Sequence, residues 1–178
     1  MKLIGISGKM GTGKSTVAQH LKLKGYEEYR FSSVIKDMVA VLLNVSPDWL
    51  EDEEFKKQTS FGVTNRFILQ TLGTDWGRQM IDENIWVNAT FNRIRSPKAI
   101  ISDVRFPNEA DAILSKGGVI IRIERDREVG DPKDRLHPSE TALDNYNFPT
   151  VYRNNGTYAE LFRFVDSVER SLKDSREV

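Results

Sequence analysis

The residues best suited to chemistry lie in a glycine-rich segment near the start of the chain. Residues 8–15 read GKMGTGKS, which matches the pattern G-x-x-x-x-G-K-[ST]. In such a turn, backbone N–H groups converge on phosphate oxygens at points where a Cβ atom would intrude. The Lys14 ammonium can reach the β- and γ-phosphates, and the Ser15 hydroxyl can ligate Mg²⁺. An apolar stretch precedes the segment and an amphipathic one follows it, which favours a nucleoside triphosphate site over a chance turn.

Asp103 is the second candidate, because it closes an apolar stretch that we expect to be a buried strand. A buried carboxylate is costly unless it meets a cation or hydrogen-bond donors. At the carboxyl edge of a parallel sheet, Asp103 would face the phosphate-binding turn. We therefore expect it to hold Mg²⁺ through water, and an ion pair with Arg105 is the alternative.

Two polar residues in the middle of the chain share a helical face. Arg66 and Gln70 are four positions apart, which makes their side chains neighbours on a helix. A guanidinium and an amide side by side can hold a phosphate group and the edge of a base. Spacing alone leaves a solvated polar surface open as the alternative.

Arginines are densest in the last third of the chain, where they are Arg122, Arg125, Arg127 and Arg135. We expect Arg122 to point outward from a strand. Arg125 and Arg127 begin a polar stretch at 126–139, and a closing lid there would bring positive charge onto a transferring phosphoryl group. A surface loop with solvated charges is the alternative.

The apolar pattern predicts strands that alternate with helices. The expected strands are residues 3–6, 99–104, 119–124 and 150–152, and the expected helices are residues 14–24, 33–43, 64–72, 78–94, 107–116 and 158–172. This alternation indicates βαβ units, a mainly parallel sheet and the α/β class. We expect a single domain over residues 1–178, with an acceptor-binding region at about 32–92 and a lid at about 126–140.

Composition excludes several kinds of protein. The 178 residues suit one domain, and their 26 basic and 26 acidic side chains cancel, which argues against a main role in binding nucleic acid polymers or anionic membranes. Without cysteine, the chain has no disulfide, thiolate metal site or cysteine nucleophile, and two histidines do not suggest a metal centre. An early glycine interrupts any signal peptide, and no apolar run approaches the roughly 20 residues of a membrane span, so we expect a cytoplasmic protein.

Three classes of nucleotide-binding protein compete for such a chain. A switch GTPase needs a guanine-reading N-K-x-D segment, which the sequence lacks. A motor or remodelling ATPase usually needs more chain for coupling. A kinase of small molecules needs a phosphate-binding turn together with arginines that can gather around the transferred group, and both are visible here.

Five stretches, in the same order, resemble those of the bacteriophage-type deoxynucleoside monophosphate kinases, which are relatives of adenylate kinase. They are GKMGTGKS at 8–15, RFILQTLGTDWGR at 66–78, SDVRFPNE at 102–109, HPSE at 137–140 and NNGT at 154–157. The first is shared by very many nucleotide-binding proteins. The LGT-D-WGR and D-V-R-F-P-N-E segments are much more specific and carry the resemblance.

The resemblance implies transfer of the γ-phosphoryl group of ATP to a deoxynucleoside monophosphate, with Mg²⁺ as cofactor. The implied ATP-binding residues are Gly8, Met10, Gly11, Thr12, Gly13, Lys14, Ser15, Thr16, Asn155, Gly156 and Thr157, of which the last three pack on adenine. The implied acceptor-binding residues are Lys36, Arg66, Gln70, Thr74, Trp76, Arg78, Arg105 and Glu140. Lys14, Arg125 and Arg127 would act on the transferred group, and Ser15 and Asp103 would hold the metal.

The family often has glutamate where this chain has Asp75, and the shorter carboxylate leaves a direct contact from that position open. His137 resembles a capping or packing residue more than a base. A homodimer is compatible with the family. The nearest alternative enzyme is a dephospho-coenzyme A kinase, which shares the turn at 8–15 and a similar N-x-G-T turn. A nucleotide-binding ATPase module without a small acceptor is the alternative from another class.

Overall fold

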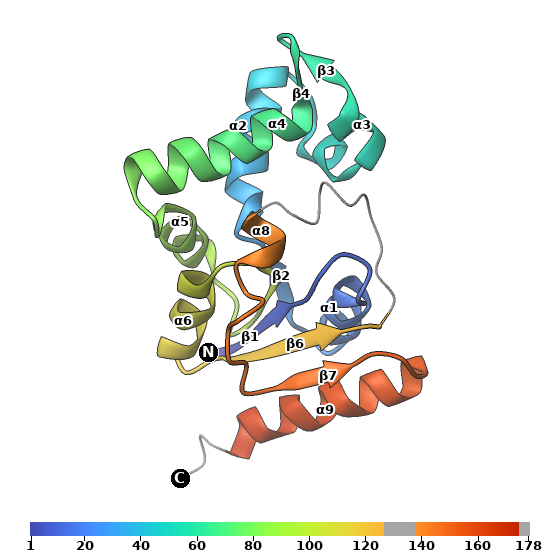
Figure 1. The fold of residues 1–178 in the computed structure, drawn as a ribbon. Coiled ribbons are helices and arrows are strands. Elements are labelled where there is room, and N and C mark those ends of the chain that lie inside the picture. The colour runs from blue at the N-terminus through green and yellow to red at the C-terminus, as the bar shows by residue number, and fades with distance from the viewer. Residues whose placement is uncertain (127–137, 175–178) are drawn as a thin grey trace. The chain divides into compact units, whose positions relative to one another are not determined.

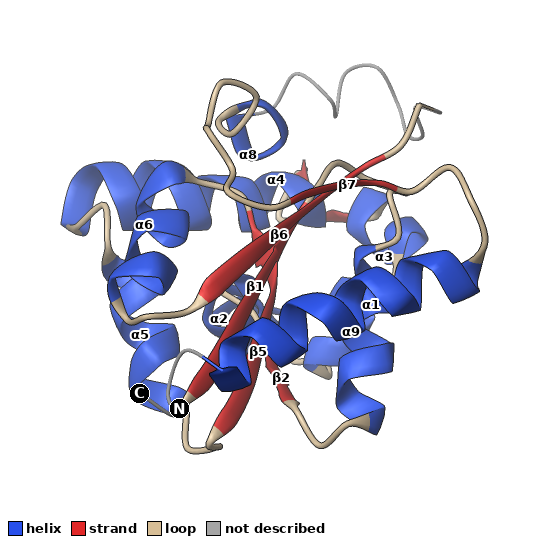
Figure 2. Ribbon diagram, turned by 90° about the horizontal axis from the view of Figure 1, so that it is seen from below, coloured by secondary structure: helices blue, strands red, loops and turns tan. Residues whose placement is uncertain are grey.

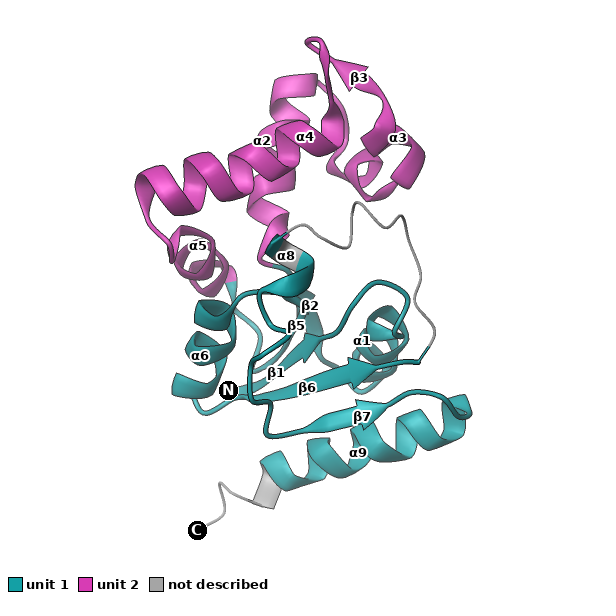
Figure 3. Cartoon of the chain, in the orientation of Figure 1, with its two compact units in different colours: residues 1–30, 94–178 teal, residues 31–93 magenta. Residues whose placement is uncertain are grey.

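The computed structural model describes residues 1–126 and 138–174, and the chain divides into two compact units (Figure 3). Unit 1 is built from residues 1–30 and from residue 94 onward, and unit 2 from residues 31–93. Unit 2 thus spans nearly the same residues as the region in which the sequence places the acceptor-binding side chains. In the described parts of the chain, no helix is long and apolar enough to cross a bilayer.

A five-stranded sheet forms the centre of unit 1 (Figure 1), and its strands lie in the order β2-β5-β1-β6-β7 (Figure 2). The strands are β1 (Lys2–Ser7), β2 (Glu27–Tyr29), β5 (Lys98–Val104), β6 (Val119–Glu124) and β7 (Val151–Arg153). Every neighbouring pair is parallel, which confirms the α/β class with a mainly parallel sheet. The carboxyl ends of all five strands therefore meet at one edge, where the residues that follow each strand can form a site.

Helices cover both faces of this sheet because its strands are apolar on both sides (Figure 2). On one face, α1 (Lys14–Leu23) and α9 (Tyr158–Asp174) bury Val17, Leu21, Leu161 and Val165 against the isoleucines of β1 and β6. On the other face lies α6 (Pro107–Ser115). A Cβ atom at Gly5 would come within 2.8 Å of Ile113 Cδ1, so glycine in β1 lets α6 pack closely against the strand.

Unit 2 is mostly helical and has a small core of its own. Its helices are α2 (Ser32–Leu43), the 3₁₀ helix η1 (Pro47–Glu51), α3 (Glu53–Lys57), α4 (Asn65–Gln70) and α5 (Ile85–Arg93), and the strands β3 (Thr59–Ser60) and β4 (Val63–Thr64) form a hairpin. Val39, Ala40 and Leu50 are buried together, and Ile68 and Leu69 of α4 pack against them. This core holds α4 in place, and with it the polar residues that α4 carries.

The helix α4 continues without a break into a π-helix, η2 (Thr71–Ile81), which the apolar pattern of the sequence does not predict. The expectation of a separate helix over 78–94 was wrong, because the helical run ends at Ile81 and resumes only at Ile85. Asp82 has an extended backbone, and its Oδ1 accepts a 2.8 Å hydrogen bond from the Asn84 N–H group. Such a turn competes with helical hydrogen bonds and separates the two helices.

Two leucines of α1 allow the packing of this helix against the unit 1 core to be tested, because one is buried and the other is exposed. Leu21 is fully buried and Leu23 is 80% exposed, although both belong to the same helix. We expect Leu21→Ala to lower the free energy of unfolding by about 2–5 kcal/mol through cavity formation. Leu23→Ala should change it by less than about 0.5 kcal/mol. Urea unfolding followed by circular dichroism measures both, and equal losses would contradict this packing.

Candidate functional site

The glycine-rich segment forms a tight turn between β1 and α1 at the carboxyl edge of the sheet. Gly8 and Gly13 both have positive φ angles, 149° and 107°. A Cβ atom at Gly8 would meet the Ile123 carbonyl oxygen at 2.4 Å, and one at Gly13 would meet Asn154 Nδ2 at 2.6 Å. Glycine is therefore required at both positions by conformation and by space. The turn leads directly into α1, whose N-terminal N–H groups are suited to an anion.

Lys14 is folded back over this turn. Its Nζ atom donates hydrogen bonds to the carbonyl oxygens of Gly8, at 2.6 Å, and Lys9, at 2.7 Å. Burial, together with the positive charges of Arg105 and Arg122, lowers the pKa of Lys14 to about 7, and the Asp103 carboxylate opposes this effect. The ammonium, two guanidiniums and one carboxylate thus lie within electrostatic reach of one another. A polyanion bound there would be stabilised by this charge.

Asp103 and Ser15 offer the oxygen atoms that Mg²⁺ prefers. Asp103 is half-buried near the end of β5, and Ser15 is exposed in the first turn of α1. Among the described residues, no group of three or more acidic, histidine or cysteine side chains could hold a metal by itself. The donor set therefore fits a Mg²⁺ ion that takes most of its ligands from phosphate and water.

Arg122 does not point outward as expected; it is buried, with 8% of its surface exposed. It pairs in register with Ser7 of β1, and its Nη1 atom donates a 3.2 Å hydrogen bond to Ser7 Oγ. Its guanidinium also lies over the Phe148 ring and 3.9 Å from Asp144. The expectation was wrong because β6 is an interior strand, so its side chains face either a covering helix or the segment at 141–150. Arg122 is a charged group of the site that spacing alone did not identify.

Arg105 and Glu140, both expected to bind substrate, form an ion pair with each other. Arg105 follows β5, and Glu140 belongs to the short helix α8 (Pro138–Thr141). The Arg105 backbone N–H donates a 2.7 Å hydrogen bond to Glu109 Oε2, which ties the residue to the start of α6. The pair therefore joins two segments of unit 1 that are far apart in the sequence.

The turn at 154–157 connects β7 to α9 and braces the phosphate-binding turn. Asn154 is buried, and its Nδ2 atom donates a 2.8 Å hydrogen bond to the Thr12 carbonyl oxygen. Asn155 donates a 2.6 Å hydrogen bond to Asp126, which lies two residues after β6. Thr157 directly precedes α9, and its N–H donates to Glu160 Oε2 at 2.7 Å. The resemblance pointed to 155–157 but not to the support that Asn154 gives.

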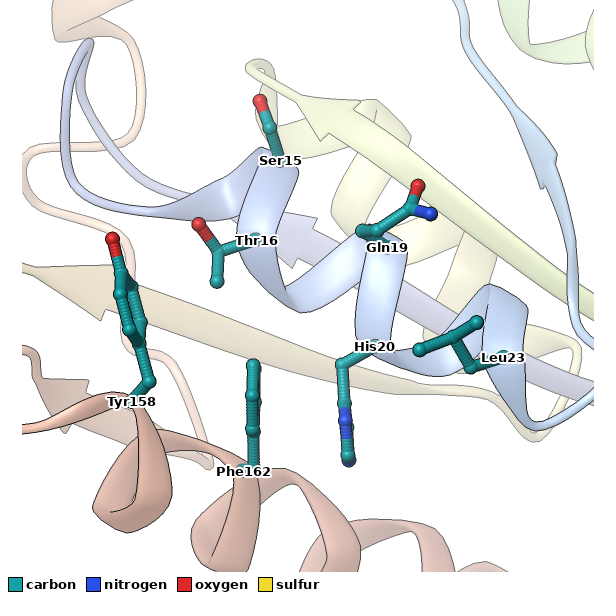
Figure 4. A pocket seen from close by; sticks show the side chains of 7 residues that line it. All are labelled: Ser15, Thr16, Gln19, His20, Leu23, Tyr158 and Phe162. Atoms are coloured by element: carbon teal, nitrogen blue, oxygen red, sulfur yellow. The ribbon is translucent and has the colours of Figure 1, made fainter.

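A groove of about 540 Å³ runs between α1 and α9 from the end of the phosphate-binding turn (Figure 4). It is lined by Ser15, Thr16, Gln19, His20, Leu23, Tyr158 and Phe162. His20 stacks on Phe162 with ring centroids 4.2 Å apart, and Tyr158 points from α9 toward α1. Aromatic faces beside a phosphate-binding turn can accommodate a flat heterocycle.

The acceptor-binding candidates of unit 2 lie on α2, α4 and η2. The three cationic side chains among these candidates are each held by a carboxylate or a carbonyl oxygen. Lys36 Nζ lies 2.6 Å from Glu51 Oε1, and Arg66 is paired with Glu53. Arg78 Nη1 donates a 3.2 Å hydrogen bond to the Glu83 carbonyl oxygen. The remaining candidates, Gln70, Thr74 and Trp76, belong to the same helical run as Arg66 and Arg78.

Of the residues expected in the lid, Arg125 is exposed directly after β6. Arg127, Arg135 and His137, and with them most of the expected lid at 126–140, lie outside the described residues.

Comparison with known proteins gives one matching family. Residues 50–165 match the family described as deoxynucleotide monophosphate kinase. A protein of Acanthamoeba polyphaga mimivirus that is named as a deoxynucleotide monophosphate kinase is 32% identical over 182 residues, which covers 91% of this chain and 93% of that protein. The deoxynucleoside-5'-monophosphate kinase of Escherichia phage T5 is 39% identical over 57 residues, or 30% of this chain and 23% of that protein.

Solved structures share the fold at low sequence identity. TT1252 from Thermus thermophilus superimposes with a TM-score of 0.51 and 17% identity over 97% of both chains. Shikimate kinase from Acinetobacter baumannii has a TM-score of 0.51 and 14% identity over 99% of this chain and 95% of the other. At these low identities the similarities establish the fold of the chain but not its substrate.

His20, which lines the groove, belongs to an ion-pair cluster that makes stability depend on pH. Asp166 Oδ1 lies 2.7 Å from His20 Nε2 and 2.5 Å from Lys24 Nζ. Burial raises the pKa of Asp166, but hydrogen bonds from Lys24 and His20 outweigh it and hold the pKa below its ordinary value. A carboxylate with a depressed folded-state pKa stabilises the fold above its unfolded pKa, and this contribution is lost as the pH falls through the folded-state pKa.

We therefore expect Asp166→Asn to lower the free energy of unfolding at pH 7. The difference from wild type should shrink as the pH falls below the ordinary aspartate value of 3.8. Urea titrations at a series of pH values measure the difference. Glu27→Gln makes a similar carboxylate-to-amide change at an exposed position on β2 and is the control. A difference that stays constant down to the lowest pH would contradict the ion pair.

Proposed function

Because this chain belongs to the deoxynucleotide monophosphate kinase family, we propose that it transfers the γ-phosphoryl group of ATP to a deoxynucleoside monophosphate, giving ADP and a deoxynucleoside diphosphate. The observation that carries the proposal is the grouping of Lys14, Arg105 and Arg122 around the glycine-rich turn of unit 1. Such a concentration of positive charge suits the triphosphate of a donor nucleotide. The chain is a phosphotransferase, and the donor and products named here extend that description.

The donor site follows from the parts of unit 1. The backbone N–H groups of residues 8–15 cradle the phosphates, and Lys14 exchanges its contacts with carbonyl oxygens for contacts with phosphate. Ser15 and Asp103 would hold Mg²⁺ with the phosphate oxygens, and when bound this ion supplies charge neutralisation there. The donor base packs on the turn at 155–157 and enters the groove beside Tyr158.

Unit 2 binds the acceptor through its cations and its amide. Lys36, Arg66 and Arg78 can each replace a carboxylate or carbonyl partner by the acceptor phosphate, and Gln70 can read a base edge. Within unit 1, Arg105 is a further candidate for a phosphate contact, and its ion pair with Glu140 orients the guanidinium. Thr74 and Trp76 shape the site.

The transfer itself needs little proton chemistry. An oxygen of the acceptor phosphate forms a bond to the γ-phosphorus, while the bond from that phosphorus to the β–γ bridging oxygen breaks and ADP departs. The attacking oxygen is already anionic near neutral pH, so no base is required. Alignment and positive charge, from Lys14 together with Arg125 and Arg127, supply the acceleration.

An assay of ADP release with each deoxynucleoside monophosphate tests the proposal. We expect ADP to form only when such an acceptor is present, and Lys14→Ala to reduce turnover by at least about a hundredfold while circular dichroism stays unchanged. Dephospho-coenzyme A serves as the control acceptor. ATP consumption that does not depend on deoxynucleotides, or turnover with dephospho-coenzyme A alone, would contradict the proposal.

Two substitutions should separate the donor site from the acceptor site. Arg66→Ala should raise the KM for the deoxynucleoside monophosphate by about tenfold or more through loss of a charge-assisted hydrogen bond, and leave the KM for ATP nearly unchanged. Tyr158→Ala should raise the KM for ATP by a few fold through loss of stacking and leave the acceptor KM unchanged. Steady-state kinetics with each substrate varied in turn measure both. If either substitution raised the KM for ATP and the KM for the monophosphate equally, the substituted residue would not belong to the site assigned to it.

A further inference from the structure

The polar residues of the α4–η2 run follow a spacing of four that a uniform α-helix cannot keep on one face. They are Arg66, Gln70, Thr74 and Arg78. In an α-helix each step of four residues turns by about 40° beyond a full circle, so the fourth side chain would point about 120° away from the first. A π-helix bonds each residue to the fifth one along and has about 4.4 residues per turn, so each step of four falls about 30° short of a circle.

The change from α-helix in α4 to π-helix in η2 therefore cancels the rotation of these four side chains about the helix axis. The step from Arg66 to Gln70 lies in α4, and the steps to Thr74 and Arg78 lie in η2. The forward rotation of the first step and the backward rotations of the next two keep all four side chains within a sector of about 70°. The result is one polar row with a guanidinium at each end and an amide and a hydroxyl between them.

The buried residues of the same helical run are also spaced by four, so the same change in winding keeps them on one side. Asn65, Gly73 and Gly77 are buried, and Leu69 packs on the unit 2 core. These positions are also spaced by four, and α-helical geometry would turn Gly77 away from the side that Asn65 buries. Burial thus follows π-helical winding, independently of the polar residues.

Trp86 of α5 is the residue that fits this winding. It is 1% exposed, and its Nε1 atom donates a 2.7 Å hydrogen bond to the Gly73 carbonyl oxygen. Its ring lies so close to Gly77 that a Cβ atom there would come within 2.3 Å of the indole. The indole thus satisfies one backbone carbonyl of the π-helix and fills the space beside the next buried turn.

We propose that Trp86 is a positioning residue that holds η2 in its π-helical form and thereby aligns Thr74 and Arg78 with Arg66 and Gln70 for the acceptor nucleotide. This role rests on the proposed function and specifies how the acceptor site is built. The row suits a ligand with a phosphate at one end and hydrogen-bonding base edges along its length, which is the chemistry of a nucleoside monophosphate.

Calorimetric titration of the full chain with a deoxynucleoside monophosphate, and separately with ATP, tests the role. Trp86→Phe keeps a ring but removes the N–H donor, so the Gly73 carbonyl loses its buried partner. We expect the Kd for the monophosphate to rise about tenfold and the Kd for ATP to change less than about twofold. Gly77→Ala, which keeps the indole but forces it away from the helix, should show the same split.

Two control variants complete the comparison. Trp49→Phe makes the same chemical change at an exposed position of unit 2, and Gln79→Ala changes an exposed side chain of η2 itself. Both should bind the two nucleotides as wild type does.

Three results would overturn the role. Monophosphate binding that survives both Trp86→Phe and Gly77→Ala would show that Trp86 does not align the row. Equal weakening of ATP and monophosphate binding would show a general structural effect instead. A wild-type chain that binds ATP but no deoxynucleoside monophosphate would overturn the proposed function, and the role of Trp86 with it.

Discussion

Crowded positive charge at the carboxyl edge of the parallel sheet is the constraint on which unit 1 depends. Lys14, Arg105 and Arg122 repel one another in a low-dielectric setting, and burial of Lys14, followed by this repulsion, lowers the pKa of Lys14. The fold offsets it with nearby oxygen atoms, from loop carbonyls under Lys14, Glu140 beside Arg105 and Asp144 near Arg122. In the proposed function, a phosphate chain would take over these contacts.

Most of the unit 1 architecture could be predicted from the sequence because its strands are apolar on both faces and its motifs follow them directly. The strand at 119–124 and the helix that begins at residue 158 lie where the pattern placed them. The three-residue strand β2 was missed, because Glu27 and Glu28 give it no apolar signal. Its pairing with β5 is a tertiary effect that local composition does not report.

In the candidate site too, residues that are close together in the sequence could be predicted, whereas features that depend on distant parts of the chain could not. The glycine-rich turn is contiguous, so its spacing alone was enough to name Lys14 and Ser15 as candidates. Arg122 was misplaced, because whether a strand residue faces solvent depends on which strands and loops flank it. The π-helix escaped prediction for a related reason, since its winding is set by the fit of Trp86 against Gly73 and Gly77. The two glycines in the segment that suggested the family are thus explained by packing.

The strand order also has a consequence for how the chain is made. β1 contains residues 2–7 and sits at the centre of the sheet, yet its two partners are residues 98–104 and 119–124. During synthesis from the N-terminus, this buried central strand leaves the ribosome more than 90 residues before it can pair. Unit 2 needs only residues 31–93 and can complete its core in that interval. Vectorial synthesis therefore favours folding of the inserted unit before the unit that encloses it in the sequence.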